Sequence, residues 1–386
     1  MDYRQDFFRV LRGERPDRTP FIFMGYWDEE SMHKLAPEGS IDENTYCYPS
    51  DYFGQDAYSS EKRTDESRKK AVELARHLGM ATIGVGKGGV LPFGHGGPGE
   101  IQPHIIERTA EHRILQYEGG HKRIIHYNPH SVHYYDFPVE TEADLDRLEL
   151  PDMKDPKRFE DIADDCNYFK EHGFVPTGSI QGFFSGLHNS FMDFADVMVN
   201  LLLEEEFMMR FTERLALMSL DAAEMLLDRG VEVIDVCDDF GNQHGLLISP
   251  QLIRKFFIPW YTELTHRVHR KGGYVHFHSH GNIATILPDL AAAGIDIINP
   301  FDWSENPDLP SLVAEYGDKI VFCGGSMHDQ QLLPIAEREE IIVRACNLRD
   351  LAERGYIYMG GQPSVDFSKE AWQEILDVTH RVCSSR

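Results

Sequence analysis

The chain has 386 residues, of which 41% are hydrophobic and 26% charged, a composition typical of a soluble globular protein. Its 64 acidic residues outnumber 38 basic ones, and the net charge of −26 argues against nucleic acid or an anionic membrane as a partner. A basic protein partner stays open. No apolar run approaches the roughly 18 residues of a membrane span, and residues 1–20 lack the apolar core of a signal peptide. Six cysteines without a Cys-x-x-Cys pair argue against a disulfide framework, so we expect a cytoplasmic location.

The first part of the chain is expected to precede the regular fold. Residues 1–60 are rich in aromatic and turn residues and are expected to form an N-terminal extension. Residues 65–79 carry apolar side chains at near-helical spacing and end in glycine, which predicts a helix. Residues 80–86 are expected to form a strand.

Two segments then interrupt the pattern. Residues 84–99 are dense in glycine but lack the Gly-Lys-Ser/Thr of a phosphate-binding loop, so we expect an irregular connection. Residues 100–137 alternate polar and apolar side chains around a Gly-Gly pair, which predicts a β-hairpin excursion from the main fold. The histidines of this excursion, His121 among them, are expected to face solvent.

Strand and helix patterns alternate after about residue 140. The clearest helix spans 205–229, where apolar side chains recur every three or four positions. Strands are predicted at 231–239, 274–281, 295–300, 319–325 and 356–361, and helices at 251–271, after Asn282, at 310–316, 334–353 and 368–382. Such alternation is typical of parallel βαβ units. We predict an α/β protein, a single (β/α)8 TIM barrel over residues 1–386, with a doubly wound sheet as the alternative.

A (β/α)8 barrel places its catalytic groups at the C-terminal ends of its strands. The residues at these positions are Asp238, Asp239, His278, His280, Asn299, Asp302, Cys323 and Gly360 to Gln362. Asp238 and Asp239 are neighbours on a strand, so they should point to opposite faces, and one of them is expected to cap the following loop. Cys323 is either a thiol of the pocket or a buried small side chain.

The stretch Tyr-Val-His-Phe-His-Ser-His-Gly at 274–281 is the most informative signal in the chain. His276, His278 and His280 occupy alternate positions, and alternate side chains of a strand point to the same face. Neutral imidazoles on one face are good ligands for a borderline metal such as zinc. The alternative is a set of buried or solvated histidines without a metal.

Several stretches resemble the uroporphyrinogen decarboxylase superfamily and, within it, the corrinoid-linked methyltransferases. They are residues 16–29, 134–152, 230–261, 275–300, 319–334 and 356–382. The resemblance implies a (β/α)8 barrel and a possible homodimer. Porphyrinogen-decarboxylating members have an arginine in the N-terminal motif, and its absence from residues 21–29 argues against a porphyrin substrate.

The resemblance also implies a metal site, with altered ligands. Thiol-methylating members bind zinc through a His-x-Cys pair and a distant cysteine near the last strand. His278 matches the first ligand, His280 stands where the cysteine would be, and residues 359–366 contain no thiol. Asp239 or Asp238 is the expected third ligand, and Cys237 and Cys323 are weaker alternatives.

Imidazole in place of thiolate leaves a metal more positive and better suited to stabilising an oxygen leaving group. We therefore expect a zinc-dependent enzyme with one zinc per chain. It would move a methyl group from a small methylated, plausibly methoxylated substrate to a separate corrinoid protein, which is an O-demethylation. No corrinoid-binding motif occurs in the chain, so the corrinoid would arrive on that partner.

The remaining site residues are assigned by position. Asp238, Asp239 and Gln243 are the expected catalytic residues: the aspartate that is not a metal ligand would, with Gln243, orient the substrate or a metal ligand. Tyr26 and Trp27 are expected to line the substrate pocket, and Cys323 to contact the substrate. Three alternatives stay open: methyl transfer from a methylcorrinoid to a thiol, a metal-free decarboxylase or lyase acting on a small acid, and a binding protein without catalysis.

Overall fold

The computed structural model describes residues 2–22, 64–85, 104–127, 130–160, 162–242, 244–301, 306–324, 339, 342–343, 346–347, 357–359 and 368–384. Eight parallel strands form one sheet in the order β1-β14-β13-β12-β11-β8-β7-β2. Their bounds are β1 Phe21–Ile22, β2 Thr82–Gly84, β7 Val175–Gln181, β8 Val233–Cys237, β11 Tyr274–His278, β12 Ile297–Asn299, β13 Val321–Gly324 and β14 Ile357–Met359. The strands follow chain order and the first lies beside the last, which confirms the (β/α)8 barrel and excludes a doubly wound sheet.

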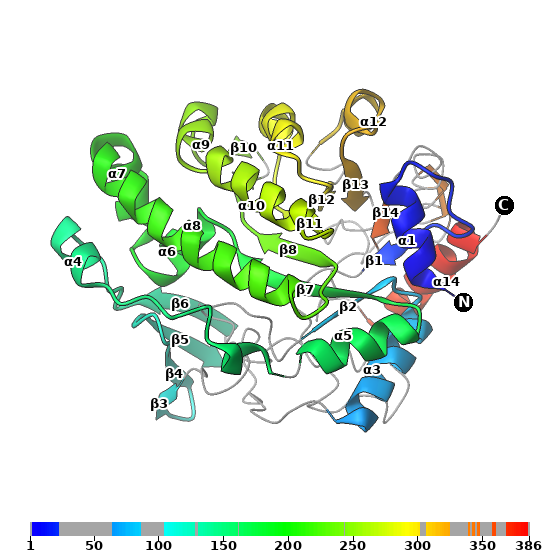
Figure 1. Cartoon of the computed structure of the whole chain (residues 1–386), viewed down its shortest axis with the longest axis horizontal. Helices are drawn as coiled ribbons and strands as arrows, with labels where there is room; N and C mark the ends of the chain where they lie inside the picture. Colours follow the sequence, from blue (N-terminus) through cyan, green and yellow to red (C-terminus); the bar gives the residue numbers. More distant parts are fainter. Residues whose placement is uncertain are drawn as a thin grey trace.

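Helices alternate with the strands and pack against them (Figure 1). The longer ones are α1 Tyr3–Leu11, α3 Asp65–Leu78, α5 Ile162–Glu171, α7 Phe194–Leu203, α8 Glu205–Leu227, α10 Ile258–Arg270, α12 Leu309–Tyr316 and α14 Lys369–Ser384. Shorter ones are α4 Glu142–Arg147, η2 Pro156–Phe159, α6 Ser185–Ser190, α9 Pro250–Phe256, η3 Ala284–Ile286 and α11 Leu287–Ala293. The outward faces of the strands and the helices share one large apolar core, to which Ile180, Val236 and Phe277 belong.

Three sequence predictions about helices are settled by these bounds. The helices predicted at 65–79 and 205–229 are confirmed as α3 and α8. The single helix predicted at 251–271 is wrong, because α9 and α10 are separate helices that meet at Phe257. Pro259 lies in the first turn of α10, where its missing N–H costs no intrahelical hydrogen bond, but it cannot continue a helix from α9.

The excursion after β2 is larger than the predicted hairpin. It is a four-stranded antiparallel sheet of β3 His104–Arg108, β4 His112–Gln116, β5 Lys122–Tyr127 and β6 His130–Tyr135. The expectation that its histidines face solvent is wrong for His121, which is fully buried. The imidazole stacks on the Tyr117 ring, with 4.7 Å between ring centroids and planes 4° apart.

The N-terminal ends of the barrel strands enclose a second, smaller apolar cluster. Val175, Val233 and Ile297 each come from the first residue of a strand and point into the barrel. Phe7 and Val10 of α1 complete this cluster and are buried in it. The helix α1 therefore closes the barrel at the end opposite to the one where catalytic groups are expected.

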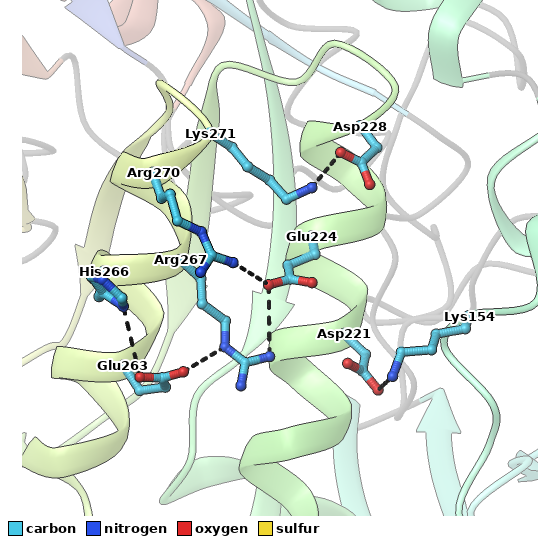
Figure 2. Close-up of polar contacts among 9 residues, drawn as sticks. All are labelled: Lys154, Asp221, Glu224, Asp228, Glu263, His266, Arg267, Arg270 and Lys271. Carbon is cyan, nitrogen blue, oxygen red and sulfur yellow. Dashed lines mark hydrogen bonds and ion pairs between the residues drawn. The ribbon is translucent and has the colours of Figure 1, made fainter.

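Charged side chains link α8 to α10 on the outside of the barrel (Figure 2). Glu224 of α8 lies 3.7 Å from Arg267 and 3.8 Å from Arg270, and Lys271 pairs with Asp228. Ion pairs of this exposed kind contribute at most about 1 kcal/mol each. They orient the two helices on each other, whereas apolar contacts supply most of the stability. Within the ranges given above, no helix combines the length and apolar character that crossing a membrane requires.

Candidate active site

The inward faces of the central strands become polar toward their C-terminal ends. Cys237 of β8 and Asn299 of β12 are the register partners of His278, and Gln181 of β7 is the partner of Cys237. His276 lies one inward position lower and its Nδ1 is 3.1 Å from the Asp235 carboxylate. His276 and His278 thus share the inward face, as expected, and His280 lies beyond the end of β11.

His278 is held in one orientation by its neighbour on β12. Its Nδ1 lies 3.1 Å from Oδ1 of Asn299, and since an amide oxygen can only accept, Nδ1–H is the donor. Nε2 therefore carries the lone pair, and it faces Oδ1 of Asp239 at 4.0 Å. Burial, with the nearby His280, lowers the pKa of His278 to about 4. The imidazole is neutral near pH 7, the form in which it binds metals.

His280 and Asp239 complete this group from two adjacent loops. The backbone N–H of His280 donates to Oδ1 of Asp239 at 2.8 Å, and its ring stands almost perpendicular to that of His278, with centroids 4.8 Å apart. Gly281 follows with φ of +88°, and a Cβ there would lie 2.3 Å from the backbone nitrogen of Asn242. Only glycine lets the two loops approach so closely, and this approach places His280 beside Asp239.

The donor types at this end of the barrel suit zinc. Two imidazoles and a carboxylate are common zinc ligands, and His278 presents a neutral nitrogen toward Asp239. The side chain of Asp239 is 51% exposed, so solvent and ligands can reach its carboxylate. Within the described ranges, however, no three His, Cys, Asp or Glu side chains are close enough together to hold a metal. The zinc site with His278, His280 and Asp239 stays a prediction.

The structure separates the roles of the two aspartates. Asp238 is buried, and its carboxylate accepts from the backbone N–H groups of Phe184 at 3.0 Å and Ser185 at 2.7 Å and from the hydroxyl of Tyr261. Burial raises its pKa. Asp238 thus caps the start of α6 and joins β8 to α10, so its cap is on the segment after β7 and not, as the sequence predicted, on the following loop. Asp239 points to the histidines.

A family assignment follows from the sequence that builds this end of the barrel. The sequence model of the family described as uroporphyrinogen decarboxylase (URO-D) matches residues 125–380, which is most of the chain. The chain belongs to the uroporphyrinogen decarboxylase family. No curated protein matches it at a significant level.

One solved structure is similar over nearly the whole chain, and two others are similar over about two thirds of it. A methyltransferase from Methanosarcina mazei is 15% identical, with a TM-score of 0.65 over 99% of each chain, and shows the same fold. D-psicose 3-epimerase from Clostridium cellulolyticum H10 is 11% identical, with a TM-score of 0.36 over 63% of this chain and 88% of that one. Xylanase 10B from Thermotoga maritima is 10% identical, with a TM-score of 0.38 over 63% of this chain and 90% of that one.

The structure adds two features that sequence reasoning missed in this URO-D protein. His188 of α6 interacts electrostatically with Asp239, and its Nε2 is buried without a hydrogen-bond partner. Burial lowers the pKa of His188 to about 4. The pair of His276 and Asp235 lies below His278, each side chain 2% exposed. Neither feature is visible as a pattern in one stretch of sequence, because the partners come from different strands or helices.

Four predicted site residues remain: Cys323, Tyr26, Trp27 and Gln243. Cys323 is fully buried with the apolar cluster at the lower end of the barrel, and burial raises its pKa well above the ordinary value. Its contact with substrate is untested. Tyr26, Trp27 and Gln243 lie outside the described residues, so their roles stay predictions.

Proposed function

We propose that this URO-D protein is a zinc-dependent methyltransferase that moves a methyl group from a small methoxylated compound to a separate corrinoid protein. The observation that supports it is the group formed by His278, His280 and Asp239, at the ends of two adjacent strands. A (β/α)8 barrel presents catalytic groups at this end. The fold shared with a methyltransferase is compatible with this proposal.

The chain's own residues prepare this site for such a reaction. Asn299 fixes the ring of His278 so that Nε2 points to Asp239, and burial keeps that imidazole neutral. Zinc bound by His278, His280 and Asp239 would supply positive charge for the departing oxygen of the substrate. The buried pair of Asp235 and His276 supports His278 from below, because these side chains fill the barrel under it.

Metal content tests the proposal most directly. Protein purified without a histidine tag is expected to hold about one zinc per chain, and His280→Ala to lose it, because the substitution removes one of three ligands. His244→Ala, at an exposed histidine of the segment after β8 that also carries Asp239, is the matched control and should keep the metal. Mass spectrometry of the three proteins gives the zinc content.

Activity is measured next, with free cob(I)alamin as acceptor and a series of methoxylated aromatic and aliphatic compounds as donors. Formation of methylcobalamin by the wild type and its loss in His280→Ala are expected. If the wild type binds no zinc even after incubation with it, the metal site is wrong. A metal-free lyase that uses the half-exposed Asp239 would then be the better hypothesis. It agrees with the finding that, among the described residues, no three His, Cys, Asp or Glu side chains are close enough to hold a metal.

A further inference from the structure

The helix α7 exposes several large apolar side chains. Leu202 and Leu203 are 71% and 73% exposed, Val199 is 50% and Phe194 42% exposed, and we call these four residues the α7 patch. Val199, Leu202 and Leu203 are spaced three and four positions apart and share one side of the helix. Its buried residues, Val197 and Leu201, lie on the other side. Several large apolar side chains exposed together mark an interaction surface.

The helix α7 follows α6, which starts at the catalytic end of the barrel. The strand β7 ends at Gln181, and α6 follows it at the catalytic end of the barrel. His188 of α6 interacts with Asp239 on one side, and on the other its ring meets that of Phe194, with 5.1 Å between centroids. Phe194 begins α7 on the side of Val197 and Leu201, whereas Val199, Leu202 and Leu203 lie further along the helix on its other side. The helix α7 lies at the edge of the molecule (Figure 1). A macromolecule bound to α7 would therefore reach the rim of the barrel mouth.

Carboxylates surround the α7 patch. The flanking positions carry Asp193, Asp196, Glu204, Glu205 and Glu206, all of them exposed. The nearby bases are already engaged, since Lys255 pairs with Glu205, and Arg210 pairs with Glu142 and Asp146. In the ranges that the structure describes, no ion pair involves Asp196, Glu204 or Glu206.

This charge pattern distinguishes between two classes of partner. Two copies of the chain joined through α7 would bring the same carboxylates together, and like charges across an interface cost several kcal/mol in typical cases. The net charge of −26 adds to the repulsion. A protein with an apolar centre ringed by lysine and arginine would instead match both the apolar area and the surrounding negative charge.

We propose that the α7 patch is the docking surface for the corrinoid protein, and that this partner presents an apolar area ringed by basic residues. The inference rests on the proposed function. Methyl transfer requires the cobalt to come within bonding distance of a substrate at the barrel mouth, so the corrinoid protein has to contact the rim. The α7 patch is an exposed apolar surface on the helix that follows α6 at this end of the barrel, and the ring contact of His188 with Phe194 joins α6 to the start of α7.

The test compares free and protein-bound corrinoid as methyl acceptors. The probes are cob(I)alamin and the corrinoid protein isolated, by its cobalt absorbance, from the cells that make this enzyme. The double variant Leu202→Ser/Leu203→Ser is expected to lower kcat/KM with the corrinoid protein about tenfold or more, because apolar anchors dominate such interfaces. Its rate with free cob(I)alamin should equal that of the wild type. Leu217→Ser, at a leucine of α8 that is 41% exposed, is the matched control.

A binding measurement separates docking from chemistry. Titration of the corrinoid protein into the wild type should show saturable binding that weakens with added sodium chloride and is lost in the double variant. Binding that is unchanged in the double variant overturns the docking surface, even where methyl transfer occurs. A wild type that is a dimer by light scattering while the double variant is a monomer also overturns it, because the patch would then join two copies. Normal binding without methyl transfer to either acceptor overturns the proposed function alone.

Discussion

Adjacent residues at the end of β8 serve different purposes because the backbone directs their side chains apart. Asp238 turns away from the histidines, and its oxygens are engaged by two backbone N–H groups of the α6 start and by the Tyr261 hydroxyl. A Cβ at Gly182 would lie 2.3 Å from the Asp238 side chain, so the loop closes tightly over this carboxylate. Asp239 is half exposed beside His278 and His280. One residue therefore fixes the loops, and its neighbour is available for chemistry.

Paired alanine variants test this division. Asp238→Ala is expected to lower the free energy of unfolding by about 3 kcal/mol or more, because several buried donors lose their acceptor. Asp239→Ala should cost less than about 1 kcal/mol, yet reduce methyl transfer about 100-fold or more if the carboxylate binds the metal. Urea unfolding and the cob(I)alamin assay measure the two effects. Equal losses of stability in both variants would show that the aspartates are not divided in this way.

The sequence identified part of the candidate site and could not identify the rest. His278 and His280 are visible as a local pattern, and Asp239 as the end of an apolar run. The hydrogen bond from His278 to Asn299 and the effect of the Asp239 charge on the pKa of His188 depend on which strands and loops are adjacent in the barrel. That information is absent from any single stretch of the chain.

At the level of elements, predictions succeeded where a strand or helix is apolar on a regular period. The helices α3 and α8 and the strands β8, β11, β12, β13 and β14 belong to this class. The sequence does not predict the strand β7, because its inward positions are Thr177, Ser179 and Gln181 and a glycine at 178 faces outward. A Cβ at Gly178 would lie 2.9 Å from Leu226 of α8, so close helix packing favours a glycine here. That glycine interrupts the apolar pattern by which a strand is predicted.

In the four-stranded sheet after β2, the sequence did not predict the burial of His121, and this burial leads to a pH prediction. Burial, with a smaller contribution from Arg123, lowers the pKa of His121 to about 3. In the unfolded chain this histidine binds a proton below about pH 6.5. The unfolded state therefore binds more protons between these values, and the free energy of unfolding falls as the pH drops from about 6.5 toward 3.

His121→Phe keeps a flat ring against Tyr117 and removes the titration. Between pH 7 and pH 4 the wild type should lose about 3 kcal/mol more stability than this variant. Denaturant unfolding at a series of pH values measures the difference. His133→Phe, at an exposed histidine of β6, is the control and should follow the wild type. Parallel curves for wild type and His121→Phe would mean that His121 is not the source of acid sensitivity.

At the scale of the whole molecule, the barrel divides into two ends with different physical demands. The strand starts form an apolar layer, whereas the strand ends carry His278, Asn299 and Asp239. Polar groups buried at one end lower stability unless they are paired, so the other end has to be well packed. The N-terminal segment supplies this packing, since β1 pairs with β14 and α1 inserts Phe7. The sequence suggested an extension there, because β1 has only two residues and carries no periodic signal.

The importance of this closure can be measured at Phe7. Its ring is fully buried among the first residues of several barrel strands, so Phe7→Ala should lower the free energy of unfolding by about 3 to 5 kcal/mol. Phe8→Ala is the matched control, because Phe8 is only partly buried against Tyr274 and should cost distinctly less. If α1 holds the whole barrel together, unfolding of Phe7→Ala stays a single transition at lower denaturant. A second, earlier transition would show that α1 detaches while the barrel persists, and a loss below about 1 kcal/mol would show that the barrel is closed without it.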